Sequence, residues 1–457
     1  MLLVQPLLGW RLRYRERVDR AGMNGRTRKP STREGGHRVP VDSERTVDSE
    51  RKTEILAAAA TLFASSGLRT SLQQIADACG ILPGSLYHHF ESKEDIFIAL
   101  VERYQAELDK IAEKALEQGM SSRAPDERIV ALGTAIADCA VRHRAALLLT
   151  LYEPPAGASE RMLRLAGRTP TAINATMLAI LDAARSSGYL RREVDLALLA
   201  DRICQSMLHV GIGVSHRIRG GERMPVIKCR MLLHGLAVRP PDDARLDRSK
   251  ARRAADETIQ SWDEDGAGMD DKAARIRAVA RSEFARRGNQ LTTIRDVAAA
   301  AGMSTGTVYR LIESKENLMS SILWSYTETT TEGWNRIVSS PSTSLEKLDA
   351  LLWFNINVVH RFADEHRIQS LGIQLAPPKS PNLTWSFPAQ LRQIKGLVSE
   401  GLRARQLQIE KGASLDMIAR CVFALIWTPE NIVREEGARD ALHFDRDTLL
   451  RGAAKRS

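Results

Sequence analysis

Gly84, Ser85, Tyr87, His88 and Lys93 lie within ten positions of one another and combine small side chains with hydrogen-bond donors. A hydroxyl, an imidazole and an ammonium can each donate to a phosphate oxygen, and hydroxyl or imidazole groups can also bond the edge of a base. Glycine lets a protein backbone come close to a ligand. If one helix presents these residues, the combination predicts contact with the phosphates and base edges of a nucleic acid.

The same combination occurs again 222 positions further along the chain, where residues 292–318 align without a gap with residues 70–96. The identical pairs are Thr70 and Thr292, Ala76 and Ala298, Ala78 and Ala300, Gly80 and Gly302, Gly84 and Gly306, Tyr87 and Tyr309, Glu91 and Glu313, Ser92 and Ser314, Lys93 and Lys315, and Glu94 and Glu316. Chance does not keep so many glycines and aromatics in register. The period is too long for a solenoid, so the repeat indicates a duplicated domain pair.

Helix signals indicate how these residues are held. Ser71 and Gln74 form an S-x-x-Q capping box that starts a short helix, and Gly80 ends it after about two turns. Pro83 fits the first position of the next helix, where its missing N–H costs nothing, and Lys93 begins a further helix. This spacing is that of a helix-turn-helix unit, whose second helix enters the major groove of DNA.

Both segments resemble the DNA-binding signature of the TetR family. The resemblance is carried by Thr70–Ser71, Ile75–Ala76, Gly80–Ile81, Gly84 to Phe90 and Lys93, and by Thr292–Thr293, Val297–Ala298, Gly302–Ser304, Gly306–Tyr309 and Lys315. It implies a three-helix DNA-binding domain followed by a helical regulatory domain, a double-stranded DNA operator as partner, and repression released by a small ligand. It also implies that the residues at Tyr87, His88 and Lys93, and their counterparts, contact bases or the DNA backbone.

The candidate DNA-binding residues are Ser71, Gly84, Ser85, Tyr87, His88, Lys93, Thr293, Ser304, Thr305, Gly306, Thr307, Tyr309, Arg310 and Lys315. Leu82 stands where the family usually has a capping Ser or Thr, whereas Ser304 fits that role. Ile312 stands where an aromatic residue is usual. Arg310 replaces His88 and is the stronger donor to a phosphate or a guanine.

The fold class expected from the whole chain is all-α, with two tandem TetR-like units. Apolar residues recur at spacings of three and four, and strand alternation is scarce. The expected parts are a basic disordered tail (1–47), a first helix-turn-helix domain (48–94), a first regulatory or ligand-binding domain (95–239), a charged linker (240–270), a second helix-turn-helix domain (271–316) and a second regulatory domain (317–447).

Composition fits this interpretation. The formal net charge is +10, and residues 1–45 contribute ten arginines and Lys29 against five carboxylates. There is no run of 18 apolar residues, and the charges follow the opening apolar segment, the reverse of a signal peptide. Five scattered cysteines without a C-x-x-C pair indicate buried thiols in a reducing cytoplasm. Whether Met1 or Met23 is the true start stays open.

The sequence contains few motifs that would indicate another function class. The chain contains no G-x-S-x-G, H-E-x-x-H, P-loop or Rossmann signature, so we expect no catalytic residue, no cofactor and no metal site. Five of the seven tryptophans lie in the second regulatory domain, and they fit either an ordinary core or a cavity for a small apolar ligand. The alternative is a DNA-bound adaptor whose second half binds a protein partner and senses no small molecule.

The tandem arrangement also bears on assembly. In the TetR family, two late helices of each subunit form the dimer, and the candidates here are residues 171–187 and 194–217 in the first copy and 386–405 and 414–428 in the second. Two copies on one chain can pair as an intramolecular pseudo-dimer, and a linker of about 30 residues spans up to roughly 100 Å. A homodimer of the tandem chain is the alternative.

Overall fold

The computed structural model describes residues 42–66, 69–117, 124–154, 157–212, 220–264, 272–375, 387–410 and 412–456. Over these residues the regular structure is helical, with two isolated β-bridges besides, which confirms the all-α prediction. The first helix begins at Asp42, so the last residues of the expected disordered tail (1–47) are helical, while residues 1–41 lie outside the described part. In the described part, no helix is long and apolar enough to cross a membrane.

The first copy consists of α2 (Asp42–Ser66), α3 (Leu72–Ala78), α4 (Pro83–Tyr87), α5 (Lys93–Glu117), α6 (Pro125–Arg142), α7 (Arg144–Thr150), α8 (Glu160–Ala166), α9 (Thr171–Ser186), α10 (Leu196–Ile212), the 3-10 turn η2 (Gly221–Arg223) and α11 (Met224–His234). We call α2, α3 and α4 the first head. Helix α5 leaves this head and packs against α6, α7 and α9, because its buried face carries Leu100, Val101, Tyr104 and Leu108 at helical spacing.

The second copy consists of α14 (Lys272–Arg287), α15 (Ile294–Ala301), α16 (Thr305–Ile312), α17 (Lys315–Ser339), α18 (Ser344–Arg361), α19 (Ala363–Leu375), α20 (Phe387–Arg403), α21 (Leu415–Leu425), α22 (Glu430–Glu436), α23 (Ala438–Asp445) and the π-helical turn η3 (Arg446–Leu450). We call α14, α15 and α16 the second head. Its core is a separate apolar cluster that includes Ile368 of α19, whereas the first head shares the main core.

The stretch expected to be a charged linker forms two helices, α12 (Asp243–Asp247) and α13 (Lys250–Glu264). Helix α13 packs against α17 and α18, and Trp262 makes edge contacts with Phe354 and Phe362 at centroid distances of 5.5 and 5.1 Å. Arg252 lies 4.0 Å over the ring of Trp353. Most of this stretch is therefore part of the second regulatory domain.

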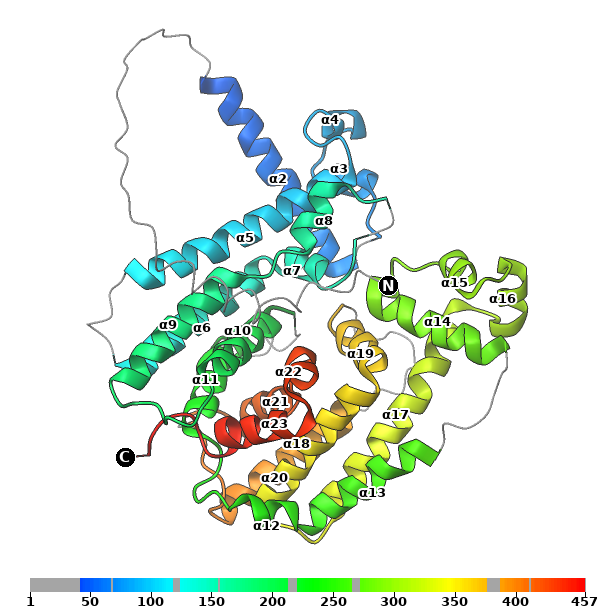
Figure 1. Ribbon diagram of the computed structural model, residues 1–457. Coiled ribbons are helices and arrows are strands. Elements are labelled where there is room, and N and C mark those ends of the chain that lie inside the picture. The colour runs from blue at the N-terminus through cyan, green and yellow to red at the C-terminus, as the bar shows by residue number, and fades with distance from the viewer. Residues whose placement is uncertain are drawn as a thin grey trace, which may run out of the picture.

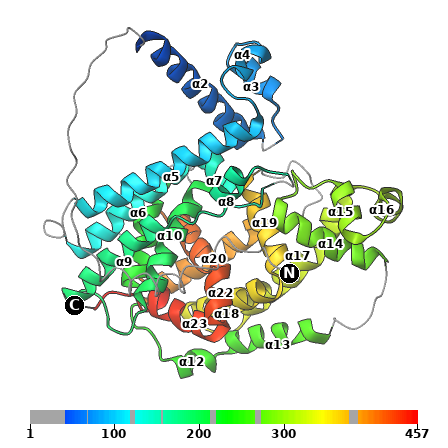
Figure 2. The same cartoon turned by 45° about the horizontal axis from the view of Figure 1, so that its top comes forward.

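The two copies lie side by side in one body, the first running from blue to green and the second from light green to red (Figure 1). Helix α11 contacts α21 and η3, and these contacts join the two regulatory domains. The first head stands above the body, and the second head lies at its side (Figure 2).

The prediction of which helices join the two copies is only partly right. Helix α10 does contact the other copy, since Arg202 donates to the carbonyl of Leu425 at the end of α21, and α21 contacts α11. Helix α9 instead packs against α5, α6 and α10, and α20 against α17, α18 and α21, all in their own copies. The prediction missed α11 and η3 because apolar stripes do not say which of several buried faces meets the partner.

Candidate nucleic-acid interface

The first head has the local structure that its sequence predicts. Ser71 caps α3, since its hydroxyl accepts the amide of Gln74 at 3.2 Å while its own amide donates to the Gln74 side chain at 2.8 Å. Gly80 takes the left-handed conformation after α3 with φ +65°. Pro83 opens α4, and Leu82 supplies no side-chain cap. The capping box, the start of α4 at Pro83 and the missing cap at Leu82 are therefore as expected.

Helix α4 turns its candidate DNA-binding residues outward. Gly84, Ser85 and His88 are exposed, and the side chain of Tyr87 is 53% exposed. Leu86 on the opposite face is fully buried. A helix with small and hydrogen-bonding groups on its free face can lie in a groove of DNA without rearranging its core.

The second head repeats this design with different side chains. Thr293 and Asp296 form a capping box on α15, and Ser304 caps α16 by accepting the amide of Thr307 at 3.2 Å. The hydroxyls of Ser304 and Thr307 also bond each other at 2.9 Å. Ile312 is buried and completes the core in place of an aromatic residue.

The outward face of α16 is more basic than that of α4. Gly306 and Arg310 are exposed and Tyr309 is 50% exposed, whereas Thr305 and Thr307 are half-buried. Arg310 occupies the position of His88 in the repeat. The two heads thus present an arginine and an imidazole at equivalent places, and their hydrogen-bonding surfaces differ.

The two lysines of the repeat begin α5 and α17 and rest on aromatic rings. The Lys93 ammonium lies 5.3 Å from the ring centroid of Phe97, and the Lys315 ammonium lies 5.9 Å from that of Phe284. Lys315 also donates to the carbonyl of Asn289. Burial lowers the pKa of Lys93, and burial together with the charge of Arg69 lowers the pKa of Lys315 to about 8. Both lysines lie where a side chain can meet a phosphate at a helix start.

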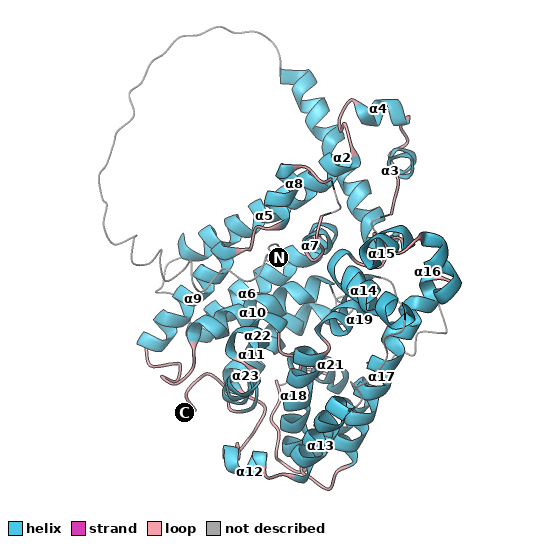
Figure 3. Ribbon diagram, turned by 45° about the vertical axis from the view of Figure 1, so that its right-hand side comes forward, coloured by secondary structure: helices cyan, strands magenta, loops and turns pink. Residues whose placement is uncertain are grey.

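The heads contact each other and the opposite copy, which the sequence did not predict. Arg69 of the first head donates to the carbonyl of Gln290 in the second at 2.5 Å, and Figure 3 shows the second head below the first. Arg286, at the end of α14, pairs with Glu153 of the first copy at 2.6 Å. Arg367 of α19 donates to the carbonyl of Leu151 at 3.0 Å. The loop that follows α7 therefore holds the base of the second head.

Backbone hydrogen bonds join the two regulatory domains in reciprocal pairs at an offset of 217 residues. We call residues 189–191, 232–238, 406–408 and 449–455 the copy interface. The pairs, written donor amide to acceptor carbonyl, are Leu236 to Leu449 (2.8 Å) with Ala453 to Leu232 (3.0 Å), Ala237 to Leu450 (2.9 Å) with Ala454 to Leu233 (2.7 Å), Arg191 to Ala453 (2.9 Å) with Gln408 to Leu236 (2.8 Å), and Lys455 to Tyr189 (2.8 Å) with Val238 to Gln406 (2.9 Å). Each bond has a counterpart with the copies exchanged, as in a twofold interface.

Two glycines at the centre of the copy interface make this approach possible. Gly235 and Gly452 are equivalent in the repeat, and both have positive φ, +72° and +88°. A Cβ on either residue would overlap the backbone of the other copy. The signal in the sequence that could have found them is a second repeat outside the helix-turn-helix motifs, Leu-Leu-His-Gly-Leu-Ala at 232–237 against Leu-Leu-Arg-Gly-Ala-Ala at 449–454.

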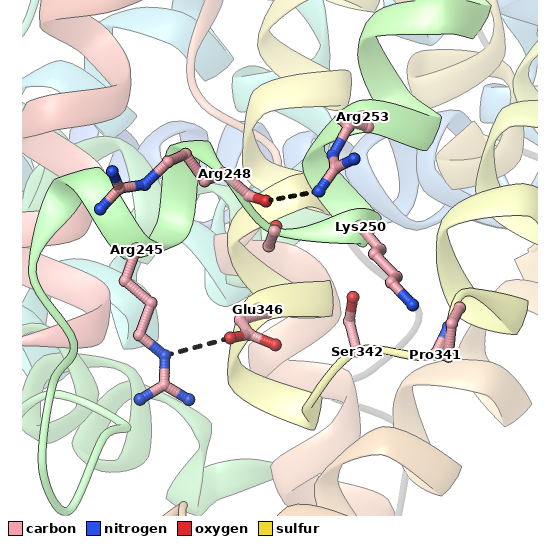
Figure 4. A pocket seen from close by; sticks show the side chains of 8 residues that line it. Arg245, Arg248, Lys250, Arg253, Pro341, Ser342 and Glu346 are labelled. Atoms are coloured by element: carbon pink, nitrogen blue, oxygen red, sulfur yellow. Dashed lines mark hydrogen bonds and ion pairs between the residues drawn. The ribbon is translucent and has the colours of Figure 1, made fainter.

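Two other clusters lie away from the heads. Donor atoms of Glu107, Cys139 and His143 lie within 4.8 Å of one another, but Glu107 is paired with Arg142 and with His143. A cleft between α12, α13 and the start of α18 is lined by four cations, one carboxylate and three uncharged residues (Figure 4). Arg245 in this cleft donates to Glu346 at 3.2 Å. Helix α12 lies on the side of the molecule away from the first head, so this cleft is not part of the candidate DNA-binding surface (Figure 1).

Comparisons with known proteins identify both heads. The family model for bacterial regulatory proteins of the tetR family matches residues 55–100 and 276–322. The HTH-type transcriptional repressor KstR2 of Rhodococcus jostii is 35% identical over 151 residues, 33% of this chain and 72% of the relative. KstR2 of Mycobacterium tuberculosis strain H37Rv is 31% identical over 152 residues, 33% of this chain and 74% of the relative. The solved ketosteroid transcriptional regulator KstR2 of that species superimposes with a TM-score of 0.33 at 20% identity, covering 38% of this chain and 95% of that one.

Proposed function

Because the chain belongs to the TetR family of bacterial regulatory proteins, we propose that it is a repressor whose two copies pair within one chain and bind one operator with two unlike heads. It is a DNA-binding transcriptional regulator, and single TetR-like units act as dimers. In this chain the second copy takes the place of the second subunit. Because the two copies are covalently joined, each meets the other at an effective concentration that does not depend on the protein concentration.

The observation that carries the proposal is the copy interface. Its four reciprocal pairs of backbone bonds use the same positions of each copy, so the two copies meet as two subunits of a dimer do. The expected site is a pair of unlike half-sites about one helical turn apart or a little more. The differing residues His88 and Arg310 give each half-site its own preference, since arginine favours guanine.

Release from DNA is assigned to a small apolar ligand in a regulatory domain. KstR2 of M. tuberculosis is described as a ketosteroid transcriptional regulator, and ketosteroids are therefore the first ligand class to test here. Helices α5 and α17 begin at the heads and run into the regulatory domains. A ligand that favours one tilt of either helix changes the separation of the heads, and it acts through its differential affinity for the two states. The site of action is the cytoplasm, where the operator lies.

Light scattering and footprinting on the full chain test the pairing. A mass near 50.7 kDa on a protected site with unlike halves is the expected result. A doubled mass on a perfect palindrome would support the homodimer of tandem chains instead.

A thermal-shift screen tests the sensor against the alternative of a protein-binding adaptor. A cognate compound from a set of ketosteroids, apolar acids and acyl thioesters should raise the melting temperature and lower operator affinity. If a compound bound tightly and operator affinity stayed the same, release by that ligand would be excluded.

A further inference from the structure

Buried charges differ between equivalent positions of the two copies. The offset of 217 that relates the copy interface makes Lys228 of α11 equivalent to Asp445 of α23, and with two extra residues before α21, Arg202 of α10 is equivalent to Cys421 of α21. All four side chains are at most 3% exposed. An ionised group in such a place is stable only with a partner of opposite charge or with several hydrogen bonds. The charges therefore bear on which copies can pair.

Arg202 and Asp445 meet across the boundary between the copies. A guanidinium nitrogen of Arg202 lies 3.7 Å from the carboxylate of Asp445. Arg202 also donates to the carbonyls of Trp427, at 2.9 Å, and Leu425. Asp445 accepts the hydroxyl of Thr428 at 2.5 Å. Burial raises the pKa of Asp445, and the charge of Arg202 opposes this rise.

The counterpart of this ion pair is missing because the residues have changed. Exchanging the copies turns Arg202 and Asp445 into Cys421 and Lys228, and burial raises the pKa of the Cys421 thiol, so these two residues form no ion pair. Lys228 instead donates to the carbonyl of Ser206 in its own copy at 3.2 Å. One of two symmetry-related contacts thus holds opposite charges, and the other holds a single cation next to a cysteine thiol.

We infer that Arg202, Lys228 and Asp445 restrict pairing to unlike copies and so favour pairing of the first and second copies within one chain. Two first copies would bring Arg202 of each chain against Lys228 of the other, which places like charges in a buried interface twice. Two second copies would bring Asp445 against Cys421 and leave two buried carboxylates without Arg202. Such unfavourable contacts exclude a wrong partner as effectively as favourable contacts select the right one. The inference rests on the proposed pseudo-dimer and names what selects it.

Charge variants of the full chain test this by light scattering over a range of protein concentrations. The double variant Lys228→Asp with Asp445→Lys gives two first copies two Arg202 ion pairs and places a lysine against Arg202 in the intramolecular arrangement. We expect a doubled mass for this variant and a single mass for the wild type. Lys228→Met, which removes the charge without adding a new ion pair, is the matched control and should keep the single mass.

Asp445→Asn keeps the size of the side chain and covers the case in which the double variant fails to fold. Hydrogen exchange at the amides of Leu236, Ala237, Ala453 and Ala454 should become about a hundredfold faster, because breaking a buried ion pair weakens the contact between the two copies. Exchange in α3 and α15 of the heads should stay as in the wild type. A rise in the exchange rate by the same factor throughout the chain would show that Asp445 has a merely structural role and would overturn the inference.

The outcomes separate this inference from the proposed function. If the wild type has a doubled mass and 15N-labelled and unlabelled chains cross-link through like copies, the pseudo-dimer itself fails. If the wild type and the double variant both have the mass of one chain, and hydrogen exchange at the copy interface is unchanged, the pseudo-dimer stands and the role of the three charges is overturned.

Discussion

The ring of Tyr152, which follows α7 in the first copy, lies against the backbone of Gly288 at the end of α14. A Cβ on Gly288 would lie 2.8 Å from the ring, and the φ of this residue is +77°. Tyr152 is itself only 9% exposed, so the ring has little room to move. One copy therefore contacts the base of the other copy's head at a place where only glycine fits.

Gly288→Ala should loosen this contact. The left-handed backbone and the clash with Tyr152 together should cost about 1–3 kcal/mol. The expected results are a lower melting temperature and faster hydrogen exchange in α14. Gly306→Ala is the control for stability, since a Cβ there meets no atom within 4 Å. Adding Tyr152→Ala to Gly288→Ala should recover part of the loss, and full additivity of the two changes would show that the ring contact is unimportant.

The lowered pKa of Lys315 predicts a pH dependence of DNA binding. Its pKa of about 8 means that the free ammonium is largely charged at pH 7 and loses its proton as the pH rises through 8. A phosphate contact needs the charged form, so operator affinity should fall above pH 8, by at most tenfold per pH unit for this group. Lys315→Arg stays charged and should flatten the profile. The same fall in both proteins would assign the pH effect to another group.

Removing either lysine should weaken binding to every DNA sequence to a similar degree. Lys93→Ala or Lys315→Ala should lower the slope of log affinity against log salt by roughly one unit, as expected for one lost phosphate contact. Titration of wild type and variants with a specific and a random duplex between about 50 and 200 mM salt measures this slope. Wild-type slopes in both variants would remove the lysines from the interface.

Exchanging the differing residues of α4 and α16 should exchange half-site preferences. His88→Arg should give the first head an added preference for guanine, and Arg310→His should take that preference from the second, with about 1–3 kcal/mol of discrimination at one base pair. Selection from a library of operators by each variant measures the preference. Unchanged consensus sequences in both would mean that these two positions do not contact bases.

Helix α13 should be needed for the stability of the second regulatory domain. Trp262→Ala removes a ring that is 8% exposed and should cost about 3–5 kcal/mol. Trp324, with 56% of its surface exposed, is a matched control whose change to alanine should lie within about 0.5 kcal/mol. Urea unfolding of both variants would decide whether residues 250–264 act as core or as linker.

The local structure of the heads followed from the sequence by itself. Caps such as Ser71 and Ser304 and the glycine ends at Gly80 and Gly302 act over three or four neighbouring residues, so the sequence carries their whole physical cause. Apolar spacing along α5 likewise gives its buried face. These signals predicted the helix-turn-helix units, the outward faces of α4 and α16 and the all-α class.

The relation between the copies was decided only by the tertiary structure. The bonds between Leu236 and Leu449, the ion pair of Arg202 with Asp445 and the contact of Tyr152 with Gly288 join residues more than 100 positions apart. An apolar stripe shows that a helix is buried but not what covers it, and a lysine such as Lys228 has the same local pattern whether it faces solvent or a core. The helices that join the copies, the place of α13 and the contact between the heads therefore depended on long-range packing, which leaves no periodic trace along the chain.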